Sequence, residues 1–153
     1  MALEIEDKYL IKCNKWRTLV TESTHISQTY MLGLKSVTIR TRIDDNRPAI
    51  LCVKLADRKN GTPEYEWRIP TLLARLCSMR NSRTLEKIRH RVPWHDVVIE
   101  VDEFLGSLQG LVVAEVELPS RDHTYPKPDW FGQNVTADKR YKNAVLVRNG
   151  IPT

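Results

Sequence analysis

The stretch EIEDK, residues 4–8, begins the pattern that decides the fold of this chain. Successive side chains of a β-strand point to opposite faces, so Glu4, Glu6 and Lys8 would lie on the same side of an extended segment. Two carboxylates and one ammonium group would then share a single face of the first strand. The fold has to explain why these charges gather there.

The same alternation of charge recurs in later runs that otherwise resemble buried strands. The acidic pairs are Glu64 and Glu66 in PEYEWRI, Glu100 and Asp102 in VVIEVDEF, and Glu115 and Glu117 in LVVAEVELP. The basic residues are Arg40 and Arg42 in TIRTRI, Lys54 in AILCVKL, and Lys87, Arg89 and Arg91 in EKIRHRV. For any one pair, the solvent face of a half-exposed antiparallel strand is an adequate explanation. Because the charges are sorted by strand throughout, the set favours a charged interior.

Most of the chain consists of short runs rich in Val, Ile, Thr, Tyr and Trp, separated by clusters of Asp, Asn, Gly and Pro. This pattern is typical of a mainly β protein. The segments DDNRP and ADRKNGT are short enough to be hairpin turns between antiparallel neighbours. We therefore predict eight strands, near residues 3–11, 25–32, 36–43, 49–55, 63–69, 84–92, 97–104 and 111–118.

Few helices are expected. NKWRTLV, from Asn14, fits a short capped helix, and TLLARLCSM, after Pro70, spaces four apolar residues along one helical stripe. Both are predicted to cover the outside of the sheet. Thr136 is a plausible N-cap for a helix over ADKRYKNAVLVRN that ends before Gly150. The segment HTYPKPDWFGQN is predicted to be an ordered loop.

If the sheet closes into a barrel, the charged faces line its interior and the apolar alternates pack outward. Those alternates are Ile5, Val37, Ile39, Trp67, Ile99, Val101 and Val116. Crowded carboxylates resist ionising together, so divalent cations should offset part of the repulsion, and all-oxygen ligation suits Mg²⁺ or Mn²⁺. The arginine and lysine side chains of the interior in turn favour a polyanionic ligand, because the arginine guanidinium group can form two parallel hydrogen bonds with phosphate oxygens. Metal ions combined with basic side chains that bind phosphate are typical of phosphoryl-transfer enzymes.

The bulk properties narrow the class of protein. At 153 residues the chain is predicted to form one domain, residues 1–153. Its formal net charge of +5 favours an anionic partner but also fits an ordinary surface. Three widely spaced cysteines predict reduced thiols. The charged N-terminal residues and the lack of a long apolar run favour the cytoplasm and argue against a membrane location.

Taken in order, the charged residues resemble one known family. They are the ExExK of Glu4, Glu6 and Lys8, the RxR of Arg40 and Arg42, Lys54, the pair Glu64 and Glu66, the KxR of Lys87 and Arg89, the ExD of Glu100 and Asp102, the ExE of Glu115 and Glu117, and the closing DKRYKN at 138–143. This series resembles the CYTH, or triphosphate tunnel metalloenzyme, superfamily over nearly the whole chain. The resemblance implies a mainly β fold, an eight-stranded antiparallel closed β-barrel with a few covering helices. Its tunnel would bind triphosphate with Mg²⁺ or Mn²⁺.

Position by position, the resemblance implies three groups of site residues. Phosphate binding is implied for Lys8, Arg40, Arg42, Lys54, Lys87, Arg89, Lys139 and Arg140. Metal binding is implied for Glu4, Glu6, Glu64, Glu66, Glu100, Asp102, Glu115 and Glu117. A catalytic role near the scissile end is implied for Glu4, Glu6, Lys8 and Tyr30, the tyrosine being equally well explained as a strand aromatic. Arg68 and Arg91 lie on the same strand faces as these residues and are expected at the tunnel rim.

The compact size and the WFG…VTADKRYKN ending are most similar to short bacterial enzymes that hydrolyse inorganic tripolyphosphate to pyrophosphate and phosphate. The expected mechanism is in-line attack of water on a terminal phosphorus, with basic groups stabilising the developing charge. A class IV-type adenylate cyclase, a nucleoside or thiamine triphosphatase, and a non-catalytic polyphosphate-binding module remain alternatives. The expected partner is tripolyphosphate or another triphosphate-containing small molecule. Specific nucleic-acid binding is not expected, and a homodimer is left open.

Overall fold

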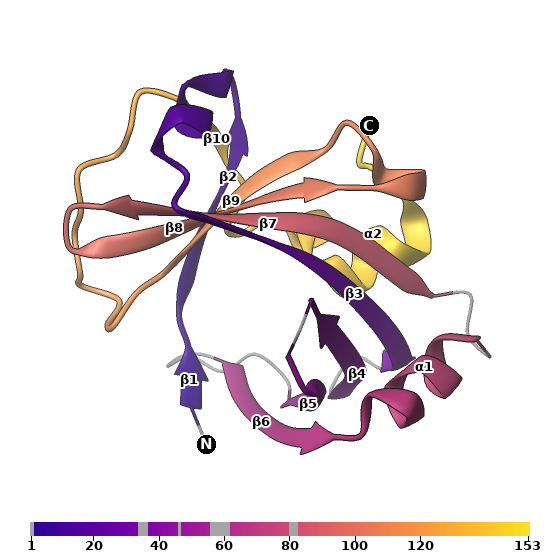
Figure 1. Cartoon of the computed structure of the whole chain (residues 1–153). Coiled ribbons are helices and arrows are strands. Elements are labelled where there is room, and N and C mark those ends of the chain that lie inside the picture. Colours follow the sequence, from indigo (N-terminus) through magenta and orange to yellow (C-terminus); the bar gives the residue numbers. More distant parts are fainter. Residues whose placement is uncertain (1, 34–36, 46, 56–61, 80–82) are drawn as a thin grey trace.

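The structure is a computed structural model that describes residues 2–33, 37–45, 47–55, 62–79 and 83–153. One antiparallel sheet dominates it (Figure 1). Its strands are β1 (Ala2–Glu4), β2 (Glu6–Ile11), β3 (Glu22–Gly33), β4 (Val37–Asp44), β5 (Ala49–Leu55), β6 (Thr62–Ile69), β7 (Thr84–Trp94), β8 (Val97–Phe104), β9 (Val112–Glu117) and β10 (Phe131–Asn134). All eight predicted strands are present, and the mainly β fold class is confirmed. Two details differ: the first strand divides at Ile5, and β10 lies in a segment predicted to be a loop.

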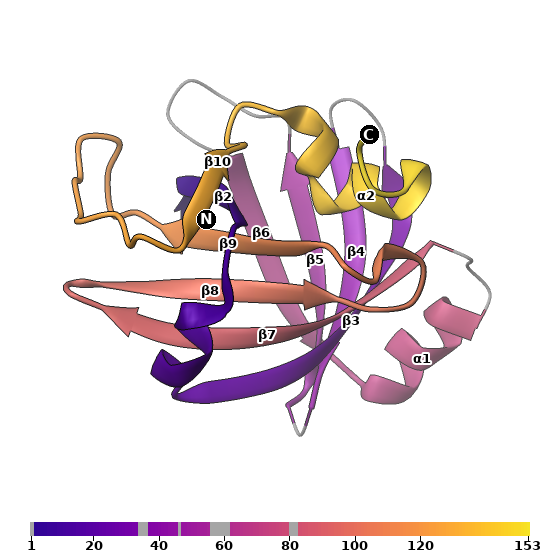
Figure 2. The ribbon, with the colours of Figure 1, turned by 90° about the horizontal axis from the view of Figure 1, so that it is seen from above.

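The sheet curls round until its two ends meet at the N-terminal segment. Its strand order is β1-β6-β5-β4-β3-β7-β8-β9-β2-β10. Strand β1 pairs with β6, opposing Ala2 to Glu64, whereas β2 pairs with β9, opposing Lys8 to Glu115. Only Ile5 separates β1 from β2. The chain itself therefore connects β1, at one end of the sheet, to β2, which lies next to the other end. The strands therefore surround an interior (Figures 1 and 2).

The outer face of β7, β8 and β9 carries the main apolar core. Ile99, Val101 and Val116 are fully buried there. They pack in one cluster with Trp16 of η1 (Asn14–Leu19), a 3₁₀ helix. The prediction that apolar alternates pack outward is confirmed for these three strand residues. Trp67 on β6 differs, since it is 52% exposed.

A second apolar cluster fills one end of the enclosure. Leu10, Phe104 and Val113 lie on the inward face, because Phe104 opposes Lys87 and Val113 opposes both Asp102 and Leu10. These side chains pack with the C-terminal helix α2 (Asn143–Asn149) and with the 3₁₀ turn η2 (Gly106–Leu108). Figure 2 shows α2 against this end of the curled sheet. The apolar plug leaves the opposite end as the approach for a ligand.

The C-terminal helix is shorter than the sequence predicts. Instead of capping a helix, Thr136 accepts a hydrogen bond from the backbone N–H of Lys8 through its Oγ1 at 2.8 Å. A 3₁₀ turn, η3 (Lys139–Tyr141), follows, and α2 begins only at Asn143. Within the described residues, no helix has the length and apolar character needed to cross a membrane.

Helix α1 (Thr71–Met79) forms where it was predicted and contacts β3, β4 and β5. Its orientation differs from the prediction, because small Ala74 is the side chain buried against the sheet. The predicted apolar stripe points to solvent instead, and its members are Leu72, Leu73, Leu76 and Met79. The helix therefore covers the outside of the sheet with the face opposite to the stripe.

Candidate functional site

The register of the sheet gathers the predicted site residues on its inward face. Directly opposed residues of antiparallel strands share a face. The opposed pairs are Lys8–Glu115, Glu115–Glu100, Arg89–Asp102, Lys54–Glu64 and Arg40–Tyr30. Residues from distant parts of the sequence therefore project into one interior.

The first charged group, which we call the Arg89 cluster, consists of Lys8, Lys87, Arg89, Glu100, Asp102 and Glu115. Arg89 is at its centre. Its Nε donates to Asp102 Oδ1 at 2.7 Å, and its Nη2 donates to Asp102 Oδ2 at 2.8 Å and to Glu115 Oε2 at 2.6 Å. Its Nη1 donates to Glu100, and the fully buried Lys87 donates to Asp102. Because Lys8 Nζ lies 2.8 Å from Glu115 Oε1, each carboxylate of the cluster meets a cation.

Burial and these ion pairs set the charge states of the cluster. Burial alone would raise the pKa of Glu115, but Lys8, Lys87 and Arg89 outweigh it and hold that pKa well below its ordinary value. Burial alone would lower the pKa of Lys8, but Glu115 outweighs it and the pKa is raised. Lys87 behaves differently, since burial and the neighbouring Arg89 lower its pKa. Lys87 is therefore the cation of this cluster whose charge depends most on its acidic partner.

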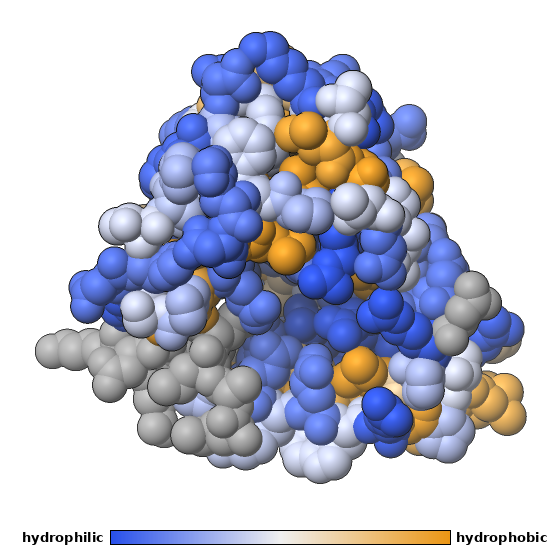
Figure 3. Space-filling view, turned by 60° about the vertical axis from the view of Figure 1, so that its left-hand side comes forward, coloured by the Kyte–Doolittle hydropathy of each residue, from blue (hydrophilic) through white to orange (hydrophobic). Residues whose placement is uncertain are grey.

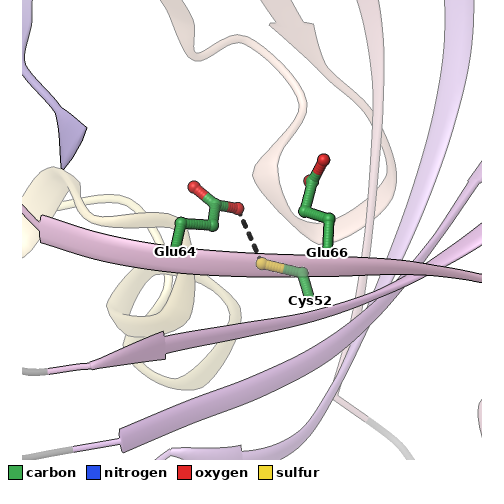
Figure 4. A group of neighbouring side chains, drawn as sticks. All are labelled: Cys52, Glu64 and Glu66. Atoms are coloured by element: carbon green, nitrogen blue, oxygen red, sulfur yellow. Dashed lines mark hydrogen bonds between the residues drawn. The ribbon is translucent and has the colours of Figure 1, made fainter. Parts of the chain in front are cut away.

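A second group, the Glu64 cluster, lies on β4, β5 and β6 and consists of Arg40, Cys52, Lys54, Glu64 and Glu66. The Arg40 Nη2 donates to Glu64 Oε1 at 3.3 Å, and Lys54 Nζ lies 3.1 Å from Glu64 Oε2. The thiol of Cys52 donates to Glu64 Oε1 at 2.7 Å. Figure 4 shows both carboxylates projecting to the same side of β6, with the sulfur beside them. One ligand atom from each of Cys52, Glu64 and Glu66 lies within 4.8 Å of the others, so the group offers a candidate ion position.

The protonation of the Glu64 cluster follows from its burial. Burial raises the pKa of the Cys52 thiol to about 12 although Arg40 opposes the shift. Burial likewise raises the pKa of Tyr30, and Arg40 offsets part of that shift. For Glu64, burial acts upward on the pKa, but Lys54, Cys52 and Arg40 outweigh it and the pKa falls. At neutral pH the interior thus presents a thiol, a phenol and a carboxylate.

The end of the enclosure away from α2 contains an open pocket of about 90 Å³. Its basic lining residues are Arg42, Arg47, Arg89 and Arg91. The Arg42 Nε lies 3.2 Å from Asp44 Oδ1, and its Nη1 lies 3.9 Å from Glu66 Oε1. A hydrophilic hollow is visible in the space-filling view (Figure 3). Charged side chains therefore extend from the interior to its open end.

The remaining predicted site residues are placed less uniformly. Glu6 and Glu117 oppose each other on β2 and β9. The side chain of Glu4 lies outside the described part of the structure. Lys139 and Arg140 are exposed on η3, and Arg140 Nη2 pairs with Asp138 Oδ2 at 2.8 Å. The contacts of Arg140 thus lie at the surface, and phosphate binding by these two η3 residues stays a prediction.

The carboxylates on β2, β8 and β9 are predicted metal ligands. Glu6, Glu100, Glu115 and Glu117 come from adjacent strands and offer only oxygen, which Mg²⁺ and Mn²⁺ prefer. The side chains of Glu6 and Glu100 are 34% and 30% exposed, so an entering ion can reach them. The Glu64 cluster adds a sulfur atom, which suits softer metals better. Among the described residues, the group whose ligand atoms lie close enough together to hold an ion is Cys52, Glu64 and Glu66, so metal binding by the carboxylates of β2, β8 and β9 stays a prediction.

Comparison with known proteins decides the family. The model of the CYTH domain matches residues 2–146 of the chain. The chain belongs to the CYTH family. The resemblance read from the charged motifs is thereby confirmed. CYTH proteins are metal-dependent, which agrees with the acidic groups of the interior.

Individual CYTH relatives match all or part of the chain. A protein from Acetivibrio thermocellus named inorganic triphosphatase is 35% identical over 154 residues, which span 97% of this chain and 96% of the relative. An inorganic triphosphatase from Nitrosomonas europaea is 40% identical over 87 residues, covering 54% of this chain and 58% of that protein. The crystal structure of the inorganic triphosphatase NE1496 superposes with a TM-score of 0.70 at 30% identity, covering 96% of this chain and 95% of that one.

The CYTH interior also contains inward residues that the charge pattern does not single out. Cys52 opposes Arg40, and Gln28 opposes Arg42. Asp44 ends the same alternation two residues after Arg42. Alternation of side chains along β3, β4 and β5 predicts that these residues point inward. A lone cysteine or glutamine in an apolar run is, however, equally typical of a packed core.

Proposed function

We propose that this CYTH protein hydrolyses inorganic tripolyphosphate to pyrophosphate and phosphate in a metal-dependent reaction. The observation that carries the proposal is the Arg89 cluster, where three carboxylates and three cations interlock inside the sheet. The activity named for the two curated relatives supports it. A substrate with its metal ion brings both kinds of charge into the interior at once.

Phosphate binding is assigned in this proposal to the inward cations Lys8, Arg40, Arg42, Lys54, Lys87 and Arg89. Each now lies beside a carboxylate. A triphosphate can take over these cations. The carboxylates that they release would then be able to hold a metal ion, so the charges of the interior would remain balanced. Fixed, water-poor donors of this kind stabilise charge more strongly than donors that must reorganise.

Metal binding is assigned to Glu6, Glu100, Glu115 and Glu117, with Glu4, Glu64 and Glu66 as further candidate ligands. When bound, Mg²⁺ or Mn²⁺ would neutralise phosphate oxygens and favour a nucleophilic water. Asp102 differs from the other acids, because both of its oxygens contact Lys87 or Arg89. In this proposal Asp102 is a positioning residue that holds these two cations toward the substrate.

The chain's own groups orient the reaction. Lys8 and Arg89 stabilise charge on the transferring phosphoryl group and on the leaving pyrophosphate, as fixed cations do in other phosphoryl transfers. The accessible carboxylates of Glu6 and Glu117 accept hydrogen bonds from the attacking water and align it in line with the scissile bond. Tyr30 stays protonated, since burial raises the pKa of its hydroxyl, and it can donate to a phosphate oxygen.

Phosphate release from tripolyphosphate, measured with Mg²⁺ and with Mn²⁺, tests the proposal. We expect equal amounts of phosphate and pyrophosphate, and a loss of roughly 100-fold or more in rate for Glu115→Gln, by analogy with other electrostatic catalytic groups. Glu103→Gln is the matched control, because Glu103 lies on the other face of β8 and pairs with Arg17 at the surface.

The alternatives give different outcomes in the same assays. Tight binding of tripolyphosphate without turnover at saturating metal would make the protein a polyphosphate-binding module. Formation of cyclic AMP from ATP would favour a cyclase, and faster release of phosphate from ATP or thiamine triphosphate would change the substrate. A panel of these compounds with each metal therefore separates the candidates.

A further inference from the structure

A polar network lies on the outer face of the sheet, away from the charged interior. Ser23 on β3 is directly opposite His90 on β7. The Ser23 Oγ lies 2.8 Å from His90 Nδ1, and the other ring nitrogen, Nε2, lies 2.8 Å from Oε2 of Glu103 on β8. The chain neighbours Arg89 and Asp102 point into the enclosure, so these three side chains point outward. A hydroxyl, an imidazole and a carboxylate are thus linked in series on a face that the proposed function does not use.

The hydrogen bonds of this network fix the tautomer of the histidine. Glu103 also accepts a hydrogen bond at 3.1 Å from Arg17 Nη1, and this guanidinium partner keeps the carboxylate ionised. An ionised carboxylate only accepts hydrogen bonds, so His90 Nε2 carries the proton and Nδ1 keeps its lone pair. That lone pair faces Ser23, whose hydroxyl is therefore the donor. His90 is accordingly placed to act as a general base toward Ser23.

Packing holds the imidazole in this position. Trp16 of η1 is fully buried, and the centroid of its ring lies 5.1 Å from that of His90. The side chain of His90 is only 12% exposed, whereas Ser23 is open to solvent. The base is thus fixed and shielded from water, and the hydroxyl beside it is accessible. A base oriented by a third group beside a nucleophile is the arrangement of acyl-transfer sites.

The backbone at Ser23 is open on the side away from β7. Within the described residues, β4 pairs with β3 only from Ile26 onward. The N–H of His25 donates to Asp45 Oδ2 at 3.1 Å, and its C=O accepts from the N–H of Asp45 at 3.2 Å, so this position faces the β4 side. Backbone groups two residues apart in a strand point the same way, so the N–H of Ser23 points past the end of β4. It can donate to an oxyanion that forms on a substrate at Ser23.

We infer that Ser23, His90 and Glu103 form an acyl-transfer site for small activated esters. His90 Nδ1 accepts the proton of Ser23 as Oγ bonds to the acyl carbon, and the proton then passes to the leaving oxygen as its bond to that carbon breaks. Water hydrolyses the acyl-serine by the same steps and frees Ser23. The position on the surface of a sheet favours a small group such as acetyl. The inference does not depend on the proposed function, because the two sites lie on opposite faces of the sheet.

Reaction of the whole chain with p-nitrophenyl acetate tests the site. Absorbance follows the release of nitrophenol, and peptide mass spectrometry locates the acetyl group, which we expect on Ser23. A general base contributes about 100- to 10,000-fold to such a rate. In His90→Gln, with its fold checked by circular dichroism, Ser23 should therefore be acetylated at least about 100-fold more slowly. Ser23→Ala should lose the fast phase of nitrophenol release.

Ser27 supplies the matched control, because it lies on the same face of β3 and is opposite Glu86 rather than a histidine. Ser27→Ala should release nitrophenol as the wild type does. Acetylation confined to lysines, or equal at Ser23 and Ser27, would overturn the site, as would an unchanged rate in His90→Gln.

Acetylation should continue in EDTA and with excess tripolyphosphate, since the interior takes no part in it. Loss of acetylation under either condition would place the reaction in the interior and refute the inference. A chain that is acetylated at Ser23 but does not hydrolyse tripolyphosphate would overturn the proposed function alone.

Discussion

Replacing Asp102 with asparagine removes one charge from a fully buried ion pair while keeping the size of the side chain. Asp102 and Lys87 are both fully buried. Lys87 donates to Asp102 and has no second carboxylate within ion-pair distance among the described residues. Arg89 would retain Glu100 and Glu115 as partners. The substitution therefore leaves Lys87 without an ionised partner among the described residues, whereas Arg89 keeps two of its three.

The expected loss follows from that burial. Removing one partner of a buried pair costs about 3–5 kcal/mol of unfolding free energy. A chain of 153 residues has roughly 8–23 kcal/mol in total, at about 0.05–0.15 kcal/mol per residue. With a urea dependence of about 2 kcal/mol per molar, the unfolding midpoint should fall by about 2 M. Asp102→Asn would then be folded in water but markedly less stable.

Urea unfolding followed by the fluorescence of the buried Trp16 and Trp130 measures this loss. Glu103→Gln on the same strand is the control, because its partly exposed pair with Arg17 contributes about 1 kcal/mol or less. Adding Lys87→Met to Asp102→Asn should restore most of the stability, since the double variant no longer contains an uncompensated buried charge at position 87. A loss below about 1 kcal/mol for Asp102→Asn alone would refute the reasoning.

Three further predictions concern acid, thiols and metal. The pKa values of Glu115 and Glu64 are lowered in the folded state, so their contribution to stability is complete above the ordinary carboxyl pKa of about 4.3 and is lost as pH falls through the lowered values. The urea midpoint should accordingly stay level from about pH 7 to 5 and decline below about pH 4, and a midpoint that rises on acidification would contradict this. Cys52, with its pKa raised to about 12, should resist iodoacetamide at neutral pH while the less buried Cys13 and Cys77 are alkylated, as peptide mass spectrometry can show; prompt labelling of Cys52 would be the contrary result. Chelation with EDTA should abolish turnover and leave the circular dichroism spectrum unchanged, because the interior carboxylates already contact cations of the chain; unfolding on chelation would show that the metal is structural.

The strands and their inward residues could be predicted because both depend on local alternation. A period of two places Glu64 and Glu66, or Lys87 and Arg89, on one face wherever the run is extended. The eight predicted runs each formed a strand within a few residues of the expected limits. The charged interior then follows from pairing, since opposed residues share a face.

Features set by tertiary contacts could not be predicted in the same way. The leucines of α1 read as a buried stripe, yet the close approach of the helix to the sheet favours small Ala74 at the contact. The segment ending at Asn134 forms strand β10 because the edge of β2 is available for pairing, with Asn134 opposite Tyr9. Arg140 belongs to a promising motif, but Asp138, two residues away, binds its guanidinium at the surface. Whether a charged side chain like that of Arg140 reaches the interior depends on which residues surround it in the fold, and local sequence does not reveal those neighbours.

The position of the first strand at the seam of the sheet has a consequence during synthesis on the ribosome. Strand β2 cannot pair until Glu117, the partner of Glu6, has been synthesised, and β1 cannot pair until Glu64, the partner of Ala2, has been synthesised. At about 5–20 residues per second, the 111 residues from 6 to 117 take roughly 6–22 s to appear. Strand β2 is thus made long before its partner β9 is available, and nascent chains carry its unpaired edge for that whole interval.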